Sequence, residues 1–188
     1  MSGKGTLVVN LFGGPAAGKS TTAAGVFSLL KLHDVECELV TEFAKDLVWE
    51  ERYKAFGDQH YIFGEQHHRM WCLLDNVDVM IADSPLMLST IYRLETLSKS
   101  FTQTVIDVVN SFNNLNIFLN RTRRYNPNGR NETEDEAKKL DVLIQDILTK
   151  YSMSYKEVPS SHHGINKVVQ LVLNRLNIEQ KFNVDTNL

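Results

Sequence analysis

Residues 6–21 read TLVVNLFGGPAAGKST, an apolar run that passes directly into a glycine-rich segment. The run at 6–12 is short and almost unbroken, which is typical of a strand covered on both faces in a parallel sheet. Residues 13–20 fit the phosphate-loop pattern of a glycine, four residues and then Gly-Lys-Ser. Apolar residues return at helical spacing from Ala23 toward His33. The stretch therefore predicts a strand, a phosphate-binding loop and a helix, in that order.

Each part of the loop has a physical reason. Glycines adopt positive φ and let backbone N–H groups turn inward around a phosphate chain. A helix that begins near Gly18 directs the positive end of its dipole at the same phosphates. Lys19 brings a positive charge to the β- and γ-phosphates, and the Ser20 hydroxyl can ligate Mg²⁺. The motif predicts bound ATP with Mg²⁺, and a glycine-rich turn without a ligand is the alternative. The residues expected to contact the nucleotide are Gly13, Gly14, Pro15, Ala16, Ala17, Gly18, Lys19, Ser20 and Thr21.

Strand-like and helix-like segments alternate along the rest of the chain. Further strands are predicted at 36–41, 77–82, 115–119 and 153–158. Helices are predicted at 43–54, 58–74, 86–97, 100–112, from 133 onward and at 165–176. This alternation predicts an α/β fold, the three-layer αβα sandwich of P-loop NTPases with about five parallel strands. The expected organisation is one domain over 1–178, with a lid at about 121–133 and a C-terminal tail at 179–188.

The composition is that of a globular protein, with 188 residues, 43% hydrophobic and 23% charged. The net charge of -3 means that any affinity for nucleic acid must come from a local patch. Cys37 and Cys72 are the only cysteines, which favours reduced thiols rather than a disulfide framework. No apolar run approaches the roughly 20 residues of a membrane helix, and no secretory signal is visible. We therefore expect a soluble cytoplasmic protein without a membrane partner.

Two carboxylates follow predicted strands. Glu42 comes after the second strand and Asp83 after the third, and the carboxyl ends of parallel strands meet at one edge. We expect Asp83 to help hold Mg²⁺ and Glu42 to act as the general base for an attacking hydroxyl. The alternative for Glu42 is a charge that only stabilises the start of the next helix.

The predicted lid is rich in arginine and has no acidic residue from 121 to 131. Such a cluster is stable when an anion lies among the guanidinium groups. We expect Arg121 and Arg124 to bind the nucleotide and Arg130 to stabilise the transferring phosphoryl group. A solvated basic loop balanced by the acidic residues after it, and a loop that contacts a nucleic-acid backbone, are the alternatives.

The predicted helix at 58–74 is the candidate wall of an acceptor pocket. His60, Gly64, His67 and Trp71 recur on one face, where they could stack on a base. Histidines that only pack against a partly buried helix are the alternative. A metal is not favoured, because no cysteine or carboxylate completes a ligand set. The residues expected to bind the acceptor are Glu42, Phe43, His67 and Arg69.

With these motifs the chain resembles the small P-loop kinases. The residues that carry the resemblance are the phosphate loop, TEFAKD at 41–46, DSP at 83–85 and NGR at 128–130. Over about residues 6–176 it is similar to the thymidylate-kinase-like and nicotinamide-riboside-kinase-like group, closest to phage kinases of 5-hydroxymethyluracil in DNA. Ser84 follows Asp83, where many deoxynucleoside kinases carry an arginine.

The resemblance implies Mg²⁺- and ATP-dependent transfer of phosphate to a hydroxyl of a nucleobase, nucleoside or nucleotide. The best-matching acceptor is the 5-hydroxymethyl group of 5-hydroxymethyluracil in phage DNA, a step in thymidine hypermodification in the host cytoplasm. A kinase of a free nucleoside or nucleoside monophosphate, of the nicotinamide riboside or thymidylate type, is the alternative. An NTP-hydrolysing switch is the alternative from another class, and a DNA-binding module without catalysis is a third. Kinases of this size are often dimers by family analogy, and the sequence leaves the oligomeric state open.

Overall fold

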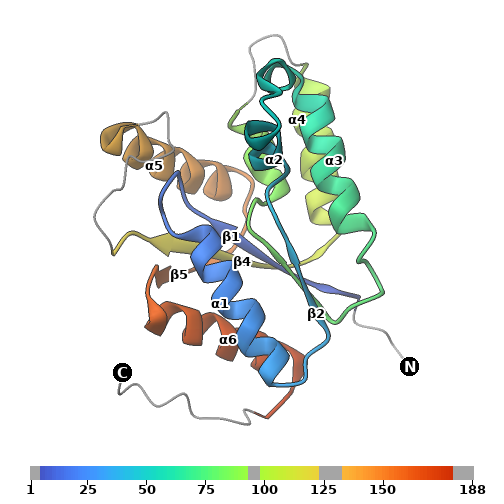
Figure 1. The fold of residues 1–188 in the computed structure, drawn as a ribbon, viewed down its shortest axis with the longest axis vertical. Coiled ribbons are helices and arrows are strands. Elements are labelled where there is room, and N and C mark those ends of the chain that lie inside the picture. Colours follow the sequence, from blue (N-terminus) through green and yellow to red (C-terminus); the bar gives the residue numbers. More distant parts are fainter. Residues whose placement is uncertain (1–4, 93–97, 123–132, 180–188) are drawn as a thin grey trace.

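The computed structural model describes residues 5–92, 98–122 and 133–179. Five strands form one sheet in the order β2-β3-β1-β4-β5, and all four pairings are parallel. Figure 1 shows this sheet between its helices, which confirms the predicted αβα sandwich. The strands are β1 (Leu7–Phe12), β2 (Cys37–Val40), β3 (Val79–Ala82), β4 (Asn113–Asn120) and β5 (Tyr155–Pro159).

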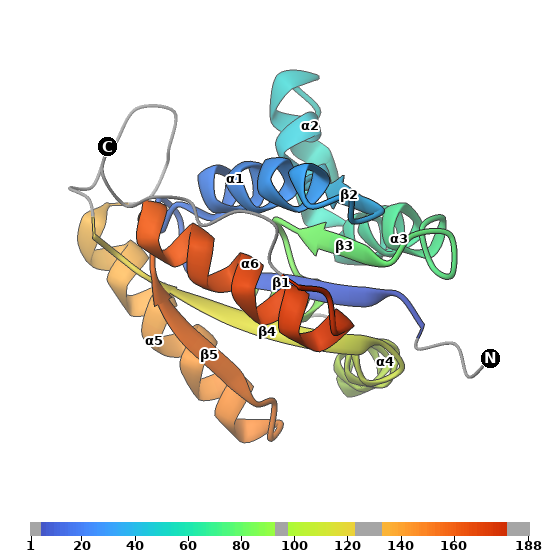
Figure 2. The same cartoon turned by 90° about the horizontal axis from the view of Figure 1, so that it is seen from below.

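Helices cover both faces of the sheet (Figure 2). Helices α1 and α6 pack side by side on one face, and α3, α4 and α5 cover the other. The helical elements are α1 (Lys19–Leu32), α2 (Phe43–Trp49), η1 (Tyr53–Gly57), α3 (Gln59–Trp71), η2 (Leu86–Thr90), α4 (Lys99–Asn110), α5 (Glu134–Lys150) and α6 (His162–Leu176). Among the described residues, we find no helix with the length and hydrophobicity needed to cross a membrane.

The apolar run at residues 6–12 forms β1, the central strand of the sheet. All six residues of β1 are buried, and they alternate between the two cores. Leu7, Val9 and Leu11 belong to the core under α1 and α6, whereas Val8 and Phe12 belong to the opposite core. An unbroken run, rather than an alternating one, is needed because both faces are covered. Since β1 lies between β3 and β4, the loop after it opens at the point where strand order reverses.

Side-chain caps define the starts of α3 and α5. The Asp58 side chain accepts a hydrogen bond from the backbone N–H of Tyr61 at 3.1 Å, which begins α3. Thr133 and Glu136 form a reciprocal capping box at the start of α5.

Three predicted helix bounds were wrong. Helix α2 ends at Trp49, because Glu51 takes a left-handed backbone with φ of 56° and the chain then forms η1. The helix predicted at 86–97 is the short 3₁₀ turn η2, and residues 93–97 lie outside the described part. Helix α6 begins at His162, ahead of the predicted start, because the Ser161 side chain accepts from the Gly164 N–H at 3.3 Å.

The two cysteines differ in accessibility, which predicts different reactivity. Cys37 is buried in β2, and this burial raises the pKa of its thiol to about 11, whereas Cys72 is exposed. At about pH 8 we expect a thiol reagent to modify Cys72 rapidly and Cys37 only after unfolding, because the thiolate is the reactive form. Titration with a chromogenic disulfide measures both phases. The Cys72→Ser variant should lose the rapid phase, and a rapid phase in that variant would contradict this description.

Candidate active site

The phosphate loop joins β1 to α1 through a backbone that needs glycine at two positions. Gly13 has φ of 146° and Gly18 has φ of 92°, both in the region that side chains disfavour. A Cβ on Gly13 would also lie 2.8 Å from the Cβ of Ala17. Ala16 adopts φ of 62°, a left-handed conformation that costs roughly 1–2 kcal/mol for a residue with a side chain. Backbone strain of this kind concentrates at functional sites.

Lys19 opens α1 with its side chain folded back over the loop. Its Nζ donates to the carbonyl oxygens of Gly13 at 2.8 Å and Gly14 at 3.2 Å. Burial lowers the pKa of Lys19, while the nearby carboxylates of Glu42 and Asp83 act in the opposite direction. Lys19 as a whole is partly buried, and the strands that precede Glu42 and Asp83, β2 and β3, are neighbours in the sheet.

Asp83 directly follows β3 and is only 5% exposed. Within the described part of the chain, its Oδ1 is buried and has no hydrogen-bond partner. A buried carboxylate oxygen without a partner is costly unless a cation or a donor meets it.

These groups fit a magnesium ion that is held jointly with phosphate oxygens. Mg²⁺ prefers oxygen ligands and usually takes only one or two from the protein when a nucleotide is bound. Asp83 offers its unpartnered Oδ1, and the hydroxyl of Ser20 lies exposed in the first turn of α1. No cluster of three or more His, Cys, Asp or Glu within residues 5–92, 98–122 and 133–179 is arranged to bind a metal by itself.

Glu42 lies at the N-cap of α2, immediately after the turn that leaves β2. In the described structure its side chain makes no capping hydrogen bond to that helix. The carboxylate instead lies close enough to Lys19 to raise its pKa. Glu42 thus lies both at a helix N-terminus and near the phosphate loop, a position that suits a role toward the loop as well as a charge at the helix start.

Arg121 is tied to the phosphate loop through Asp141 of α5. The Nε and Nη2 atoms of Arg121 donate to the Asp141 carboxylate, and Nη1 donates to the Pro15 carbonyl at 2.7 Å. The Gly14 N–H also donates to Asp141, at 2.6 Å. Both charged side chains are only 16% exposed. The other predicted lid residues, Arg123, Arg124 and Arg130, lie outside the described residues.

Comparison with known proteins agrees with this geometry. The family model described as AAA domain (AAA_28) matches residues 8–164. The chain belongs to the AAA_28 family. No curated protein sequence gives a significant match.

Solved structures share the fold of this AAA_28 domain at low identity. NadR protein in complex with NAD and AMP-PNP has a TM-score of 0.61 and 12% identity over 95% of this chain and 52% of that chain. NadR in complex with NR has a TM-score of 0.59 and 12% identity over 95% of this chain and 53% of that chain. A shikimate kinase from Bacteroides thetaiotaomicron has a TM-score of 0.44 and 16% identity over 93% of this chain and 99% of that chain. The chain spans about half the length of the NadR chains, and the likeness to NadR shows that the fold is shared.

The turn that carries Glu42 in this AAA_28 domain is held from α3. Arg69 pairs with Asp46, donates to the Thr41 hydroxyl at 3.1 Å and lies 5.1 Å from the centre of the Phe43 ring. The buried Phe43 ring also meets Tyr61 edge to face at 5.3 Å. Phe43 and Arg69, which are predicted to bind an acceptor, thus lie beside Glu42. The Arg69 guanidinium is already bonded to Asp46 and to the Thr41 hydroxyl.

His67 does not lie beside them. Its ring stacks on Phe63 at 6.0 Å and on Phe112 at 6.3 Å. Phe112 precedes β4, whose first residue pairs with the first residue of β1, so this stack lies toward the amino ends of the strands. Burial and the neighbouring His68 lower the pKa of His67. Stacking of the predicted face on a base therefore stays a prediction, and in this structure the His67 ring is occupied by its two phenylalanine neighbours.

Sequence reasoning missed two polar residues near the site, the buried Gln66 and the largely covered Asp141. Asp141 occurs at helical spacing with Ala137, Ile144 and Leu148, the buried face of α5. Gln66 lies similarly in α3, one turn before the buried Met70. A polar residue on the buried face of a helix was the available signal in both cases, because such a group needs a partner.

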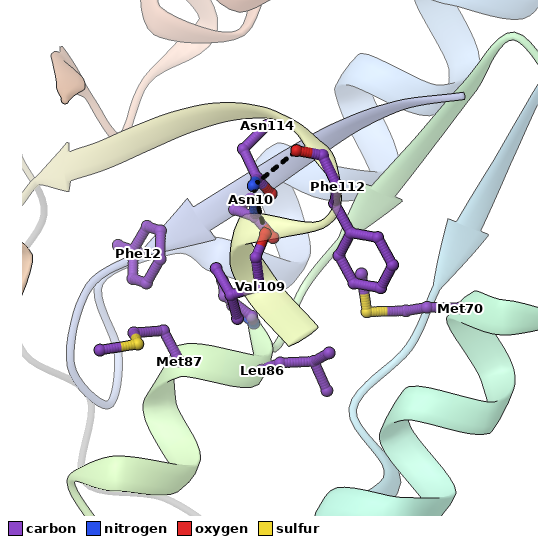
Figure 3. Close-up of a pocket in the computed structure, with 9 residues that line it drawn as sticks. Asn10, Phe12, Met70, Leu86, Met87, Val109, Phe112 and Asn114 are labelled. Carbon is purple, nitrogen blue, oxygen red and sulfur yellow. Dashed lines mark hydrogen bonds between the residues drawn. The ribbon is translucent and has the colours of Figure 1, made fainter. Parts of the chain in front are cut away.

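A small pocket lies under β1, among side chains of α3, η2 and α4 (Figure 3). At its polar end, the Asn10 side chain donates to Asn114 at 2.8 Å and to Asn116 at 3.0 Å. Its remaining lining is apolar, and no carboxylate, lysine, arginine or histidine of the described residues contributes to it. The pocket therefore provides no group for acid–base chemistry or phosphate binding.

The contact between Asp141 and the loop predicts a large effect on stability. Asp141→Ala should lower the free energy of unfolding by about 3 kcal/mol, because the Arg121 charge and the Gly14 N–H lose their acceptor. Urea denaturation measures the loss. As a control, Lys138→Ala breaks a pair with Glu134 whose side chains are 57% and 53% exposed. That change should stay within about 0.5 kcal/mol. Equal losses in the two variants would contradict the described role of Asp141.

Proposed function

We propose that this protein is a Mg²⁺-dependent phosphotransferase that moves the γ-phosphoryl group of ATP to a hydroxyl of a nucleobase, nucleoside or nucleotide. The observation that carries the proposal is the phosphate loop after β1, with Glu42 and Asp83 directly after the strands β2 and β3 on the same side of the sheet. The Lys19 ammonium lies on the phosphate loop, and the carboxylates of Glu42 and Asp83 lie near enough to shift its pKa. A donor site and a candidate base are thereby close together.

The residues have separate roles in the proposed reaction. Loop N–H groups and Lys19 orient the β- and γ-phosphates, for which the Lys19 ammonium leaves the Gly13 and Gly14 carbonyls. Ser20 and Asp83 would hold Mg²⁺, which neutralises phosphate charge when bound. Glu42 accepts the proton of the acceptor hydroxyl, whose oxygen attacks the γ-phosphorus in line as ADP leaves.

Arginines complete the proposed donor side. Arg121 and Arg124 are proposed to bind the nucleotide, and Arg130 to neutralise charge on the phosphoryl group during transfer. For Arg121 this role requires the guanidinium to exchange its bond to the Pro15 carbonyl for one to the nucleotide. The pairing with Asp141 can persist through that exchange, because Nε and Nη2 make it.

For the acceptor, the 5-hydroxymethyl group of 5-hydroxymethyluracil in DNA is the first candidate, on the strength of the motif resemblance to phage kinases. NadR, which shares the fold, is described in complexes with NAD, NR and AMP-PNP, which supports a nucleoside or nucleotide as the wider class. A free nucleoside or nucleoside monophosphate is therefore the alternative acceptor. Phe43 and Arg69 are proposed to shape the acceptor side, since both contact the turn that carries Glu42.

A hydrolysing switch is the second candidate function, favoured by the AAA-domain description of the family. In that case water takes the place of the acceptor. Incubation with γ-labelled ATP and each acceptor class, including DNA that contains 5-hydroxymethyluracil, separates the two functions. Label in an organic product supports the transferase, and label found only in inorganic phosphate supports the switch.

Lys19→Ala is expected to abolish phosphoryl transfer while the protein stays folded, because the phosphates lose their mobile positive charge. Steady-state transfer rates and a thermal melt measure the two properties. Lys31→Ala is the matched control, because Lys31 lies in the last turn of the same helix, where it makes an exposed pair with Glu38 and lies over the Phe27 ring. Near-normal turnover in Lys19→Ala would remove the argument from the phosphate loop.

Glu42→Gln is expected to reduce kcat by about 10²–10⁴, the usual contribution of a general base, with the KM for ATP little changed. Glu38→Gln, at an exposed position of β2, serves as the control and should keep full activity. A loss of less than about fivefold in Glu42→Gln would reassign Glu42 to helix stabilisation or substrate placement.

A further inference from the structure

Gln66 of α3 holds the turn that carries Glu42 by both ends of its side-chain amide. Its Oε1 accepts the backbone N–H of Phe43 at 2.8 Å, and its Nε2 donates to the backbone carbonyl of Thr41 at 3.2 Å. The two bonds therefore fall on the residues immediately before and after Glu42. Gln66 is itself only 5% exposed.

The orientation of this amide follows from its partners. A backbone N–H can only donate and a carbonyl can only accept, so Oε1 must face Phe43 and Nε2 must face Thr41. A buried amide is unfavourable unless its polar atoms are paired, and here both ends have a partner. The two bonds to the turn therefore offset the cost of burying the Gln66 amide.

The same contact affects what the Glu42 side chain is free to do. Phe43 is the first residue of α2, and its N–H is one of the first-turn donors that have no partner within a helix. Gln66 supplies that partner from another helix. The Glu42 side chain makes no capping bond to α2 in the described structure and lies near Lys19 instead.

Arg69 holds the outer side of the same turn, one helical turn along α3. It donates to the Thr41 hydroxyl at 3.1 Å and pairs with Asp46 of α2. The Arg69–Asp46 pair is half exposed, whereas the Gln66 bond to Phe43 is buried and its bond to Thr41 is partly buried. Water can replace the contacts of Arg69 more readily than those of Gln66. We therefore expect Gln66 to contribute more than Arg69 to the position of the 41–43 turn.

We propose that Gln66 is a positioning residue, which fixes the 41–43 turn so that the Glu42 carboxylate meets the acceptor hydroxyl. This inference rests on the proposed function, in which Glu42 is the base. Gln66 touches neither substrate in this account and acts only through Glu42. Its loss should therefore lower kcat and leave the KM for ATP nearly unchanged.

The test is a double-mutant cycle between Gln66 and Glu42. Gln66→Met keeps the length of the side chain and removes both hydrogen bonds. We expect it to lower kcat by about tenfold or more in the wild-type background and by less than about threefold in the Glu42→Gln background. The KM for ATP should change by less than about twofold in both.

Gln59→Met is the matched control. Gln59 is also a buried glutamine of α3, at 7% exposure, and its Nε2 donates to the Phe56 carbonyl at 3.1 Å, away from the 41–43 turn. This change should leave kcat within about twofold, since it removes a similar bond without touching the turn. Thermal melts of all variants separate loss of folding from loss of positioning. If Gln66→Met does not fold, the cycle is run with Gln66→Glu, which keeps an acceptor for the Phe43 N–H and replaces the donor to Thr41.

The outcomes distinguish the two proposals. An equal reduction of kcat by Gln66→Met with and without the Glu42 carboxylate, or no reduction in either background, would overturn the role of Gln66 while transfer remains intact. If label appears only in inorganic phosphate, the phosphotransferase proposal fails. The same cycle, measured on hydrolysis, then still decides whether Gln66 positions Glu42. A wild-type protein that releases no ADP with any acceptor or with water would overturn both.

Discussion

The positive charge of Lys19 is the feature on which the arrangement of the site depends. Burial disfavours that charge and lowers its pKa, and the groups that oppose this effect come from separate parts of the chain. Loop carbonyls meet the ammonium directly, while Glu42 and Asp83 approach it from the ends of neighbouring strands. A triphosphate would bring further negative charge to the same position. The fold thus prepares one cation for a polyanionic ligand.

Two long-range contacts fix the surroundings of that cation. On one side, Asp141 joins α5 to the loop through the Gly14 N–H and through Arg121. On the other side, Gln66 joins α3 to the turn around Glu42. Each is a polar group with little exposure to water that needs a partner, so each converts the packing of a helix into a defined position for a functional residue. The site is therefore braced from helices that contribute no predicted phosphate ligand.

The sequence was sufficient for those features that depend on local pattern or on sheet topology. The unbroken apolar run predicted β1, the glycines predicted the loop, and the rule that parallel strands end at one edge brought Glu42 and Asp83 together. Asp141 and Gln66 were not predicted, because their bonds join residues far apart in the sequence. The spacing of His67 suited a substrate face and a packed face equally, and it gave no sign that the ring would stack on Phe112, which is distant in the sequence.

Calorimetric titration of the folded protein with magnesium–ATP tests the central claim most directly, since it needs no knowledge of the acceptor. The account predicts a saturable heat of association with one nucleotide per chain. The affinity should be much lower in Lys19→Ala, which lacks the ammonium group that binds the phosphates. A well-folded sample that shows no heat of association at about millimolar nucleotide, a concentration that reveals even weak binding, would contradict it.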